Sequence, residues 1–483
     1  MPDEQLARLQ AIVQAPSPVG LEGAMSHGVI KDLFEEIAPP AWAVRTFQGS
    51  ASIVLDTHPD AEPEDELFTL MLVGHADKIR MQVRSVGADG KVWINSDSFL
   101  PLTLLGNEVT LFSEDPARPG EGAYRRLQGG TVEALGAIHF ASAGVRSGAA
   151  GIKADQLYLE LGLHGSAAER KAQVEALGIR PGDSLLLQRD LVRGFGEDTV
   201  VGPYLDNGAG CFVVAEVARL AAAAGLLQSG WASKVRVIFA IASHEEIGRF
   251  GSRVLASTLK PDALIAVDGK FNDDDKQLKG RTNYSLRSRS SSLCATPPPP
   301  HSLQLTLSPT PTHPAVNHDY DAAPGVGDRR FPSLKMGAGF TLSVGAVASE
   351  ALNGAIEKAA GARSIPSQRD VVGRDTGTDA MAAVLGNIDC AATSVGFPIR
   401  NMHTVSELAH TGDLLAATHA LFGLIEDMEK NGAMASTEAF SAAHARLDAD
   451  LPVLTGADAV ALAKAKKEKD KKKKKKDEEK EEE

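Results

Sequence analysis

Two adjacent glutamates, Glu245 and Glu246, directly follow the apolar run VRVIFAIASH. Two carboxylates so close together repel each other unless a positive group lies between or beside them. Adjacent glutamates are more often an exposed helix start, where the helix dipole favours negative charge. The sequence must therefore supply a cation for this pair, or the pair has no chemical role.

Other acidic and imidazole side chains also follow apolar runs, namely His75, Asp206, Asp268 and His403. Each alone has an ordinary explanation, since a single histidine is usually a surface residue and Asp-Asn-Gly is a turn signal. In an open α/β sheet, however, sites form in the crevice outside the carboxyl ends of the strands. If all five runs are strands of one such sheet, their ends meet in one cleft.

Imidazoles and carboxylates without thiolates suit zinc, cobalt or manganese in a hydrolytic site. A pair of such ions needs a bridging carboxylate, with one imidazole and one further carboxylate for each ion. The sequence offers this set and leaves one carboxylate over as a base. One glutamate of the pair would then bind metal, while its neighbour takes the proton of a water that bridges the ions. The ions would remove the repulsion between the two glutamates.

The elements that must position these residues follow two patterns. Apolar runs at 50–56, 67–74, 234–242, 261–269 and 389–399 alternate with helices such as 210–225, which predicts an α/β sheet. Two helices, over 3–13 and 24–37, precede them. Between 81 and 192, short apolar runs with dense turn signals predict a compact β-rich module, interrupted by one helix over 165–178.

Composition narrows the class of protein. The chain has 483 residues with 50 Lys and Arg against 63 Asp and Glu, a net charge of −13, which argues against a nucleic-acid-binding face. Three cysteines are too few for a disulfide framework or a cysteine-based zinc site. We see no secretory signal and no apolar run of the ~20 residues that span a bilayer. We expect a cytoplasmic protein without membrane or nucleic-acid partners.

Two segments do not fit a folded core. Residues 273–321 are rich in Ser and Pro, and residues 455–483 form a Lys block followed by a Glu block. Both compositions predict disorder. The first segment is either a surface loop or sequence translated from an imperfect gene model.

Six motifs occur in order along the chain: HAD from His75, LDNGAGC, HEEIGRFGS, AVDG, GTDA and IRNMHTVSE. Together they resemble the successive motifs of the tetrahedral (TET) dinuclear-metal aminopeptidases of the glutamyl and deblocking type. Some members of that family have been called cellulases or endoglucanases. The resemblance covers residues 1 to about 428, apart from the Ser/Pro-rich insert.

The resemblance implies an α/β fold with a phosphorylase/hydrolase-like mixed sheet sandwiched by helices and an inserted small β-rich domain. Residues 1–80 and 193–430 would form the metallopeptidase domain, and 81–192 a dimerisation or assembly domain. The family also implies a homo-oligomer of twelve subunits that removes N-terminal residues from peptides.

The resemblance assigns roles residue by residue. Asp206 would bridge two divalent ions per subunit, Zn or Co. Glu246 and His403 would complete one metal site, and His75 and Asp268 the other.

It also assigns roles around the ions. Glu245 would be the general base and then the proton donor to the leaving amine, while Asp77 would hold the imidazole of His75. Thr378 and Asp379 would line the substrate pocket, although either one could equally cap the helix that follows.

The sequence departs from the family pattern at two positions: Lys78 replaces an acid and Asn207 replaces an aspartate. Neither is a metal ligand in the family. A metal-dependent carboxypeptidase or amidohydrolase of the same clan, or an inactive scaffold with the same fold, remains the alternative function. Glycoside hydrolysis needs two carboxylates without metals and leaves His75 and His403 unexplained. The β-rich module lies between His75 and Asp206, which favours the aminopeptidase.

Overall fold

The computed structural model describes residues 1–62, 65–134, 143–147, 150–228, 234–269, 334–373 and 375–431. These all belong to one compact unit, Met1–Ala443. The segments 273–321 and 455–483, for which the sequence predicts disorder, lie outside the described residues. Among the described helices, none is long and apolar enough to cross a membrane.

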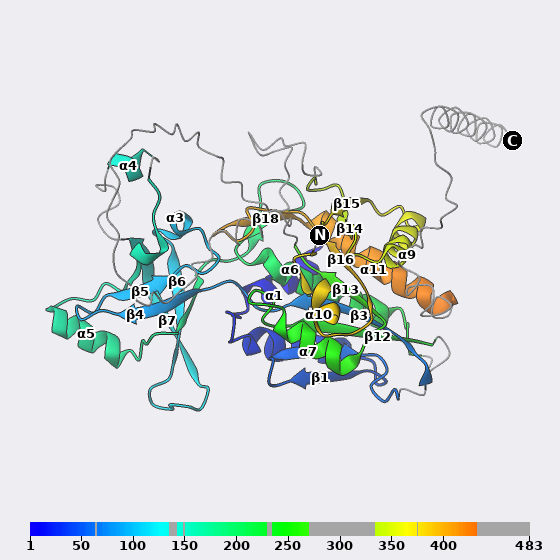
Figure 1. The fold of residues 1–483 in the computed structure, drawn as a ribbon, viewed down its shortest axis with the longest axis horizontal. Helices are drawn as coiled ribbons and strands as arrows, with labels where there is room; N and C mark the ends of the chain where they lie inside the picture. The colour runs from blue at the N-terminus through cyan, green and yellow to red at the C-terminus, as the bar shows by residue number, and fades with distance from the viewer. Residues whose placement is uncertain are drawn as a thin grey trace, which may run out of the picture. The chain divides into compact units, whose positions relative to one another are not determined.

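An eight-stranded mixed sheet forms the centre of the fold (Figure 1). Its inner strands β12, β3, β13 and β16 run parallel, while β2 and β14 run antiparallel to the inner strands that they flank. This arrangement confirms the predicted α/β class with a mixed sheet. In spatial order the strands are β1 (Ala43–Phe47), β2 (Ser52–Asp56), β12 (Val235–Ala242), β3 (Phe68–His75), β13 (Ala263–Val267), β16 (Ala391–Gly396), β14 (Phe340–Val344) and β15 (Ser367–Val371).

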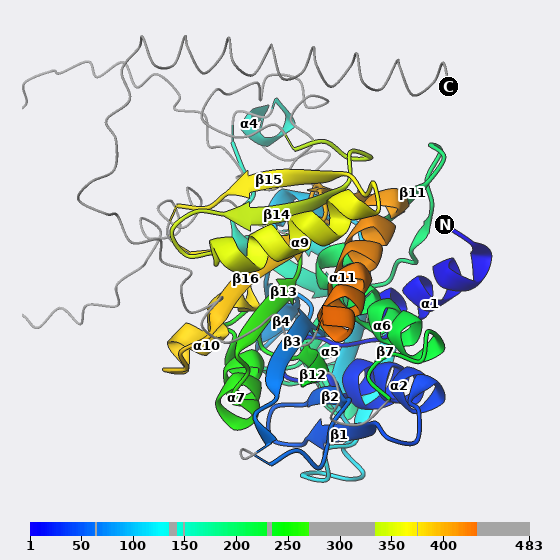
Figure 2. The same cartoon turned by 90° about the vertical axis from the view of Figure 1, so that its right-hand side faces the viewer.

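Helices cover both faces of this sheet, which is why its inner strands are largely apolar. One face packs against α1 (Asp3–Gln14), α2 (Lys31–Ile37), α6 (Leu205–Ala223), α9 (Glu350–Ala362) and α11 (Thr411–Asn431). The other packs against α7 (Phe250–Leu259) and α10 (Ala382–Leu385) (Figure 2). Successive residues of β3 alternate between the two cores, Leu72 in the first and Val73 in the second. The helix predicted over 24–37 begins with a π-helical turn, Met25–Ile30.

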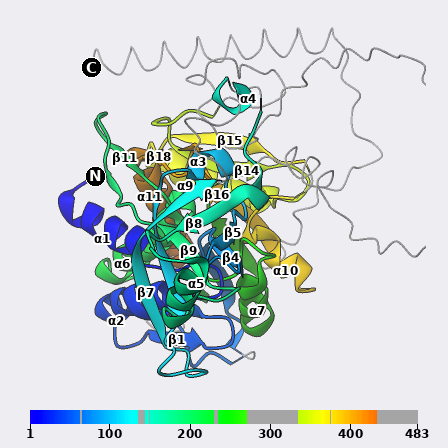
Figure 3. The same ribbon diagram turned by 90° about the vertical axis from the view of Figure 1, so that its left-hand side faces the viewer.

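The predicted β-rich module is a closed barrel of six antiparallel strands, inserted after β3 (Figure 3). Around the barrel the strands are β4 (Met81–Val86), β5 (Val92–Asn95), β8 (Leu157–Glu160), β7 (Tyr124–Ala134), β6 (Glu108–Glu114) and β9 (Ser184–Leu187). Short helices α3 (Pro101–Leu104), α4 (Ala143–Arg146) and α5 (Ala167–Ala176) lie along this part of the chain. Helix α5 begins with a capping box in which Ser166 and Glu169 satisfy each other's backbone amides.

A second, four-stranded antiparallel sheet was not anticipated. Its order is β10 (Val192–Arg193), β11 (Thr199–Gly202), β18 (Glu407–His410) and β17 (Ile399–Arg400). Asp206 follows β11 and His403 follows β17, so the expectation that all five ligand-bearing runs end in one sheet is wrong. Strand β11 stops at Gly202 because Pro203 has no amide to donate, and Tyr204 then turns the chain with a positive φ of 68°.

Candidate metal centre

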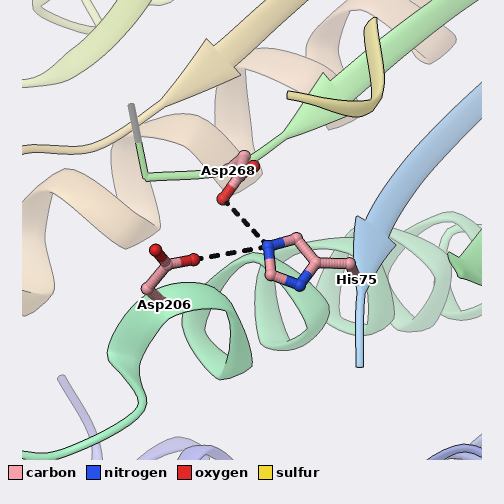
Figure 4. Close-up of side chains that lie close together, drawn as sticks. All are labelled: His75, Asp206 and Asp268. Carbon is pink, nitrogen blue, oxygen red and sulfur yellow. Dashed lines mark ion pairs between the residues drawn. The ribbon is translucent and has the colours of Figure 1, made fainter. Parts of the chain in front are cut away.

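The first group of candidate ligands lies at the carboxyl edge of the main sheet. His75 is the last residue of β3, Asp268 directly follows β13, and Asp206 lies in the first turn of α6. Nε2 of His75 is 3.3 Å from Oδ1 of Asp206 and 3.6 Å from Oδ1 of Asp268 (Figure 4). All three side chains are buried, and their ligand atoms lie within 4.8 Å of one another.

A second group shares Asp206 with the first. Nε2 of His403 is 2.9 Å from Oδ2 of Asp206 and 3.5 Å from Oε1 of Glu246. The two oxygens of Asp206 therefore face two different imidazoles, one oxygen to each. This is the arrangement that a carboxylate bridging two ions requires.

The side chains present fit a pair of divalent ions. Oε1 of Glu246 and Oδ1 of Asp268 are buried, and neither has a hydrogen-bond partner among the described residues. Each lies near an imidazole nitrogen, Glu246 at 3.5 Å from His403 and Asp268 at 3.6 Å from His75. Buried carboxylate oxygens without a hydrogen bond are costly, so they mark a place for a cation. Burial also raises the pKa of Asp268 to about 7. Burial alone would also raise the pKa of Asp206. Its contacts with His403 and His75 outweigh this effect and hold the pKa below its usual range.

Glu245 belongs to neither group of ligands. Its Oε1 is 3.4 Å from Nε of Arg249, and Nη1 of Arg249 is 3.1 Å from Oδ2 of Asp375. Both side chains of the Glu245–Arg249 pair are mostly buried, at 10% and 12% exposure. Burial raises the pKa of Glu245 well above its usual range. Glu245 is thus a carboxylate outside both ligand groups. It adjoins Glu246 in the chain and is held by the guanidinium of Arg249.

Asp77 fixes the turn that carries the two glutamates. Its Oδ1 accepts a hydrogen bond of 2.9 Å from the amide of Glu245, and its Oδ2 one of 3.0 Å from the amide of Glu246. Nδ1 of His75 is 3.1 Å from the carbonyl oxygen of Asp77 and 3.5 Å from its Oδ1. Asp77 therefore contacts His75 mainly through its backbone, while its carboxylate accepts the amides of the glutamate turn.

The carboxylate of Glu407 fixes the two other loops that carry candidate ligands, those of His403 and Asp206. The sequence alone assigns Glu407 no role. Its Oε1 accepts from the amide of His403 at 2.8 Å, and its Oε2 from the amide of Asp206 at 3.1 Å. The side chain is buried, which raises its pKa to about 8. The only signal in the sequence is that Glu407 closes the motif IRNMHTVSE.

Thr378 and Asp379 lie at the start of a short 3₁₀ helix, Asp379–Met381. Oγ1 of Thr378 accepts a hydrogen bond of 3.3 Å from the amide of Ala380, which is the capping role. One carboxylate oxygen of Asp379 accepts from Ser252, while Oδ2 is buried and has no hydrogen-bond partner in the described part of the chain. Burial raises the pKa of Asp379 to about 6, and its charge in turn raises the pKa of Glu245.

The two unusual residues of the motifs form hydrogen bonds with backbone carbonyl groups. Nζ of Lys78 donates to the carbonyl oxygens of Val13, at 2.7 Å, and of Ala15 at the end of α1. Asn207 donates to the carbonyl of Val267 at 2.9 Å. None of these bonds involves a candidate ligand side chain, so the candidate metal centre is compatible with both departures.

Comparison with known proteins gives the family. A sequence model described as M42 glutamyl aminopeptidase matches residues 60–288 and 318–420, which is more than half of the chain. The chain belongs to the M42 family. The break in this match, 289–317, lies inside the Ser/Pro-rich insert.

Individual relatives of this M42 protein are distant. It is 22% identical over 429 residues to the lysyl aminopeptidase of Pyrococcus furiosus, covering 87% of this chain and 96% of that protein. The matches to FrvX of Escherichia coli and to the glutamyl aminopeptidase of Lactococcus lactis span little more than half of those proteins, 58% and 54%.

Solved structures of relatives share the fold. Aminopeptidase APDkam598 of Desulfurococcus kamchatkensis superposes with a TM-score of 0.64 at 18% identity, over 92% of this chain and 98% of that one. The TET1 peptidase of Pyrococcus horikoshii does so with a TM-score of 0.57 at 16% identity, over 87% and 98%. This likeness confirms the TET-type fold with its inserted barrel.

Proposed function

We propose that this M42 family protein is an aminopeptidase that hydrolyses the N-terminal residue from peptides with two divalent ions, Zn or Co. The observation that carries the proposal is the pair of ligand groups that share Asp206. His75 and Asp268 would hold one ion and Glu246 and His403 the other. When bound, the ions would polarise the scissile carbonyl and lower the pKa of a bound water.

Glu245 is the group left to move protons. Its carboxylate takes a proton from the water whose oxygen attacks the carbonyl carbon, and it then delivers that proton to the amine nitrogen as the C–N bond breaks. Arg249 supports its position, as do the hydrogen bonds that the amides of Glu245 and Glu246 donate to Asp77. The unpaired Oδ2 of Asp379 is available to bind the ammonium group of the substrate, and Thr378 fixes the backbone beside it.

The assembly is part of the proposal. The P. horikoshii TET1 peptidase can assemble into a tetrahedron or a large octahedral shell. We propose that this chain forms a homo-oligomer, a dodecamer in the tetrahedral form, and that the barrel β4–β9 contributes to it. We also propose a cytoplasmic location, with peptides as the substrates.

The test compares release of aminoacyl chromophores by the chelated protein, the zinc form and the cobalt form, together with Glu245→Gln. We expect metal-restored cleavage that disappears in this variant while the variant still binds two ions. Glu175→Gln, an exposed carboxylate on α5, is the control and should cleave normally. If the wild type with two bound ions cleaves no aminoacyl substrate but cleaves N-blocked peptides at their C-terminus, the carboxypeptidase alternative is correct. If it cleaves neither, the protein is a scaffold.

A further inference from the structure

A cavity of about 160 Å³ lies between the barrel and the end of α1. The barrel contributes residues of β6, β7 and β9, and the opposite wall includes Lys78 and Tyr204. Its described lining contains none of the candidate metal ligands. The cavity is smaller than the roughly 300–1,000 Å³ of pockets that hold drug-sized ligands. Its size therefore suits a small ion rather than a peptide.

Lys78 is the first unusual group in this lining, because it stands where the family pattern has an acid. It is buried, and Nζ donates to the carbonyl oxygens of Val13 and Ala15. An ammonium has three N–H groups, so one is left without an acceptor among the described residues. No carboxylate oxygen of these residues lies within 4.0 Å of Nζ. Burial lowers the pKa of Lys78 to about 7, the usual effect on an ammonium without a counter-ion.

Tyr204 adds a second buried donor to the same cavity. Its hydroxyl oxygen accepts a hydrogen bond of 2.7 Å from the amide of Leu187, but its own O–H has no acceptor in the described part of the chain. Nζ of Lys78 lies 5.4 Å from the centre of the Tyr204 ring, so the two side chains are neighbours. Buried donors without acceptors are costly. The buried end of the cavity therefore offers two donors that an anion would satisfy.

The exposed end of the cavity is also positive. Arg126 on β7 and Arg189, two residues after β9, are exposed, and no described carboxylate oxygen lies within 4.0 Å of either guanidinium. The one acid among the described lining residues is Asp190, whose Oδ1 accepts from the side-chain amide of Gln14 at 2.7 Å. Asp190 also lies within 4.0 Å of no described cationic nitrogen. The lining thus sets three cations against one acid.

We propose that this cavity binds a tetrahedral oxyanion of the phosphate class, with Lys78 and Tyr204 at its buried end and Arg126 and Arg189 at its exposed end. Arginine binds phosphate through paired hydrogen bonds, and lysine binds it as a point charge. An acid at position 78 would repel such an anion, so the site depends on this departure from the family pattern. The anion has two possible sources: free phosphate, or the phosphate group of a small monoester.

An anion held in this cavity would connect three parts of the fold. Tyr204 lies two residues before Asp206, and Lys78 directly follows Asp77. Arg126 and Arg189 belong to the barrel part of the chain. The bound anion would therefore tie the barrel to two of the turns that position the candidate metal centre.

The test is a calorimetric titration of the full chain with sodium phosphate, after metal and chelator have been removed. No ion at the metal centre then competes for the phosphate. The variants are Lys78→Met and the double variant Arg126→Gln, Arg189→Gln. The matched control is the double variant Arg84→Gln, Arg118→Gln, because both of these arginines are exposed on the barrel part of the chain and neither lines the cavity.

We expect the wild type to bind one phosphate per chain. Lys78→Met and the variant of Arg126 and Arg189 should each bind it roughly tenfold more weakly or worse, since hydrogen bonds to a charged group are lost. The control should keep the wild-type affinity. If Lys78→Met does not fold, the variant of the two exposed arginines still decides. Absence of phosphate binding by the wild type, or equal affinities in the two double variants, overturns the proposal.

Two further titrations of the wild type define the ligand. Acetate should bind far more weakly than phosphate, and equal binding of the two overturns the phosphate class. Glycerol 3-phosphate separates the sources: tighter binding than phosphate identifies a small monoester, and equal or weaker binding identifies the free ion. None of these measurements needs turnover, so their outcome is independent of the proposed peptidase activity.

Discussion

The carboxylate of Glu407 accepts a hydrogen bond of 2.8 Å from the backbone amide of His403. Its other oxygen binds the amide of Asp206, so one buried side chain holds the backbone of two candidate ligands. Asp77 holds the glutamate turn in the same way. The candidate ligands on these loops are therefore fixed by backbone contacts with carboxylates that are not themselves ligands, a support that metal sites commonly need.

Replacing Glu407 with Gln should weaken ion binding 10–100-fold, the usual range for loss of such a supporting group. The amide nitrogen of Gln cannot accept a bond, so one of the two backbone amides loses its partner. Calorimetric titration of the chelated protein with zinc measures the effect. Glu429→Gln is the control, because Glu429 also accepts from a backbone amide, that of Leu227 at 2.7 Å, but far along the chain from any candidate ligand. Equal zinc affinity in the two variants would contradict the supporting role.

Replacing Arg249 with Leu should lower kcat about 10–100-fold with a smaller change in KM, because Glu245 loses the cation that orients it. Arg249→Lys should restore part of the rate. The control is Arg253→Leu, one turn further along α7, whose arginine bonds only to the carbonyl of Leu385 at 3.4 Å. Steady-state kinetics at saturating metal measure kcat and KM for each variant. A wild-type kcat in Arg249→Leu would show that the ion pair is dispensable.

Lys78 should make stability depend on pH. Burial lowers its pKa from 10.5 to about 7, so between these values the unfolded chain binds a proton that the folded chain does not. Stability then rises with pH in this window, by at most about 1.4 kcal/mol per pH unit for one proton. Urea unfolding of the wild type and of Lys78→Met at pH 7, 8 and 9 tests this. The free energy of unfolding of the wild type should rise relative to the variant, and parallel curves would refute the assignment.

Removal of bound ions should destabilise the fold. An ion present at 100 times its dissociation constant contributes about 2.7 kcal/mol. Without ions, Asp206, Glu246 and Asp268 also bring negative charges close together. The melting temperature should therefore fall on chelation and recover with zinc, and the change should be smaller in Asp268→Asn. Identical melting in chelator and in zinc would argue against a metal site.

The sequence predicts five of the eight strands of the main sheet, β2, β3, β12, β13 and β16, because these are largely apolar and bounded by turn signals. It misses β1, β14 and β15, which lie at the two edges. The ends of β3, β12 and β13 place His75, the glutamate pair and Asp268 at one edge, as the pattern of apolar runs indicated. The need for helices on both faces follows from the burial of these strands on both sides.

The second sheet could not be predicted in this way. Strand β17 has two residues, Ile399 and Arg400, and pairs with β18, which has four. Such strands exist through tertiary pairing rather than local preference. The bonds from the amide of Glu245 to Asp77 and from the amide of Asp206 to Glu407 are also invisible in the sequence, because they join residues 168 and 201 positions apart.

The two ligand groups draw on different stretches of the chain, and this has a consequence for synthesis. A domain folds as a unit, and successive domains form from the N-terminus onward as the chain emerges from the ribosome. His75, Asp206 and Asp268 are all present once Asp268 has emerged. The second group, Asp206, Glu246 and His403, is incomplete until His403 has emerged. The supporting carboxylate of Glu407 emerges later still. Because Glu407 also holds the amide of Asp206, which both groups share, neither group has its full support until Glu407 has emerged. We therefore expect both ions to load only after nearly the whole folded unit has been made.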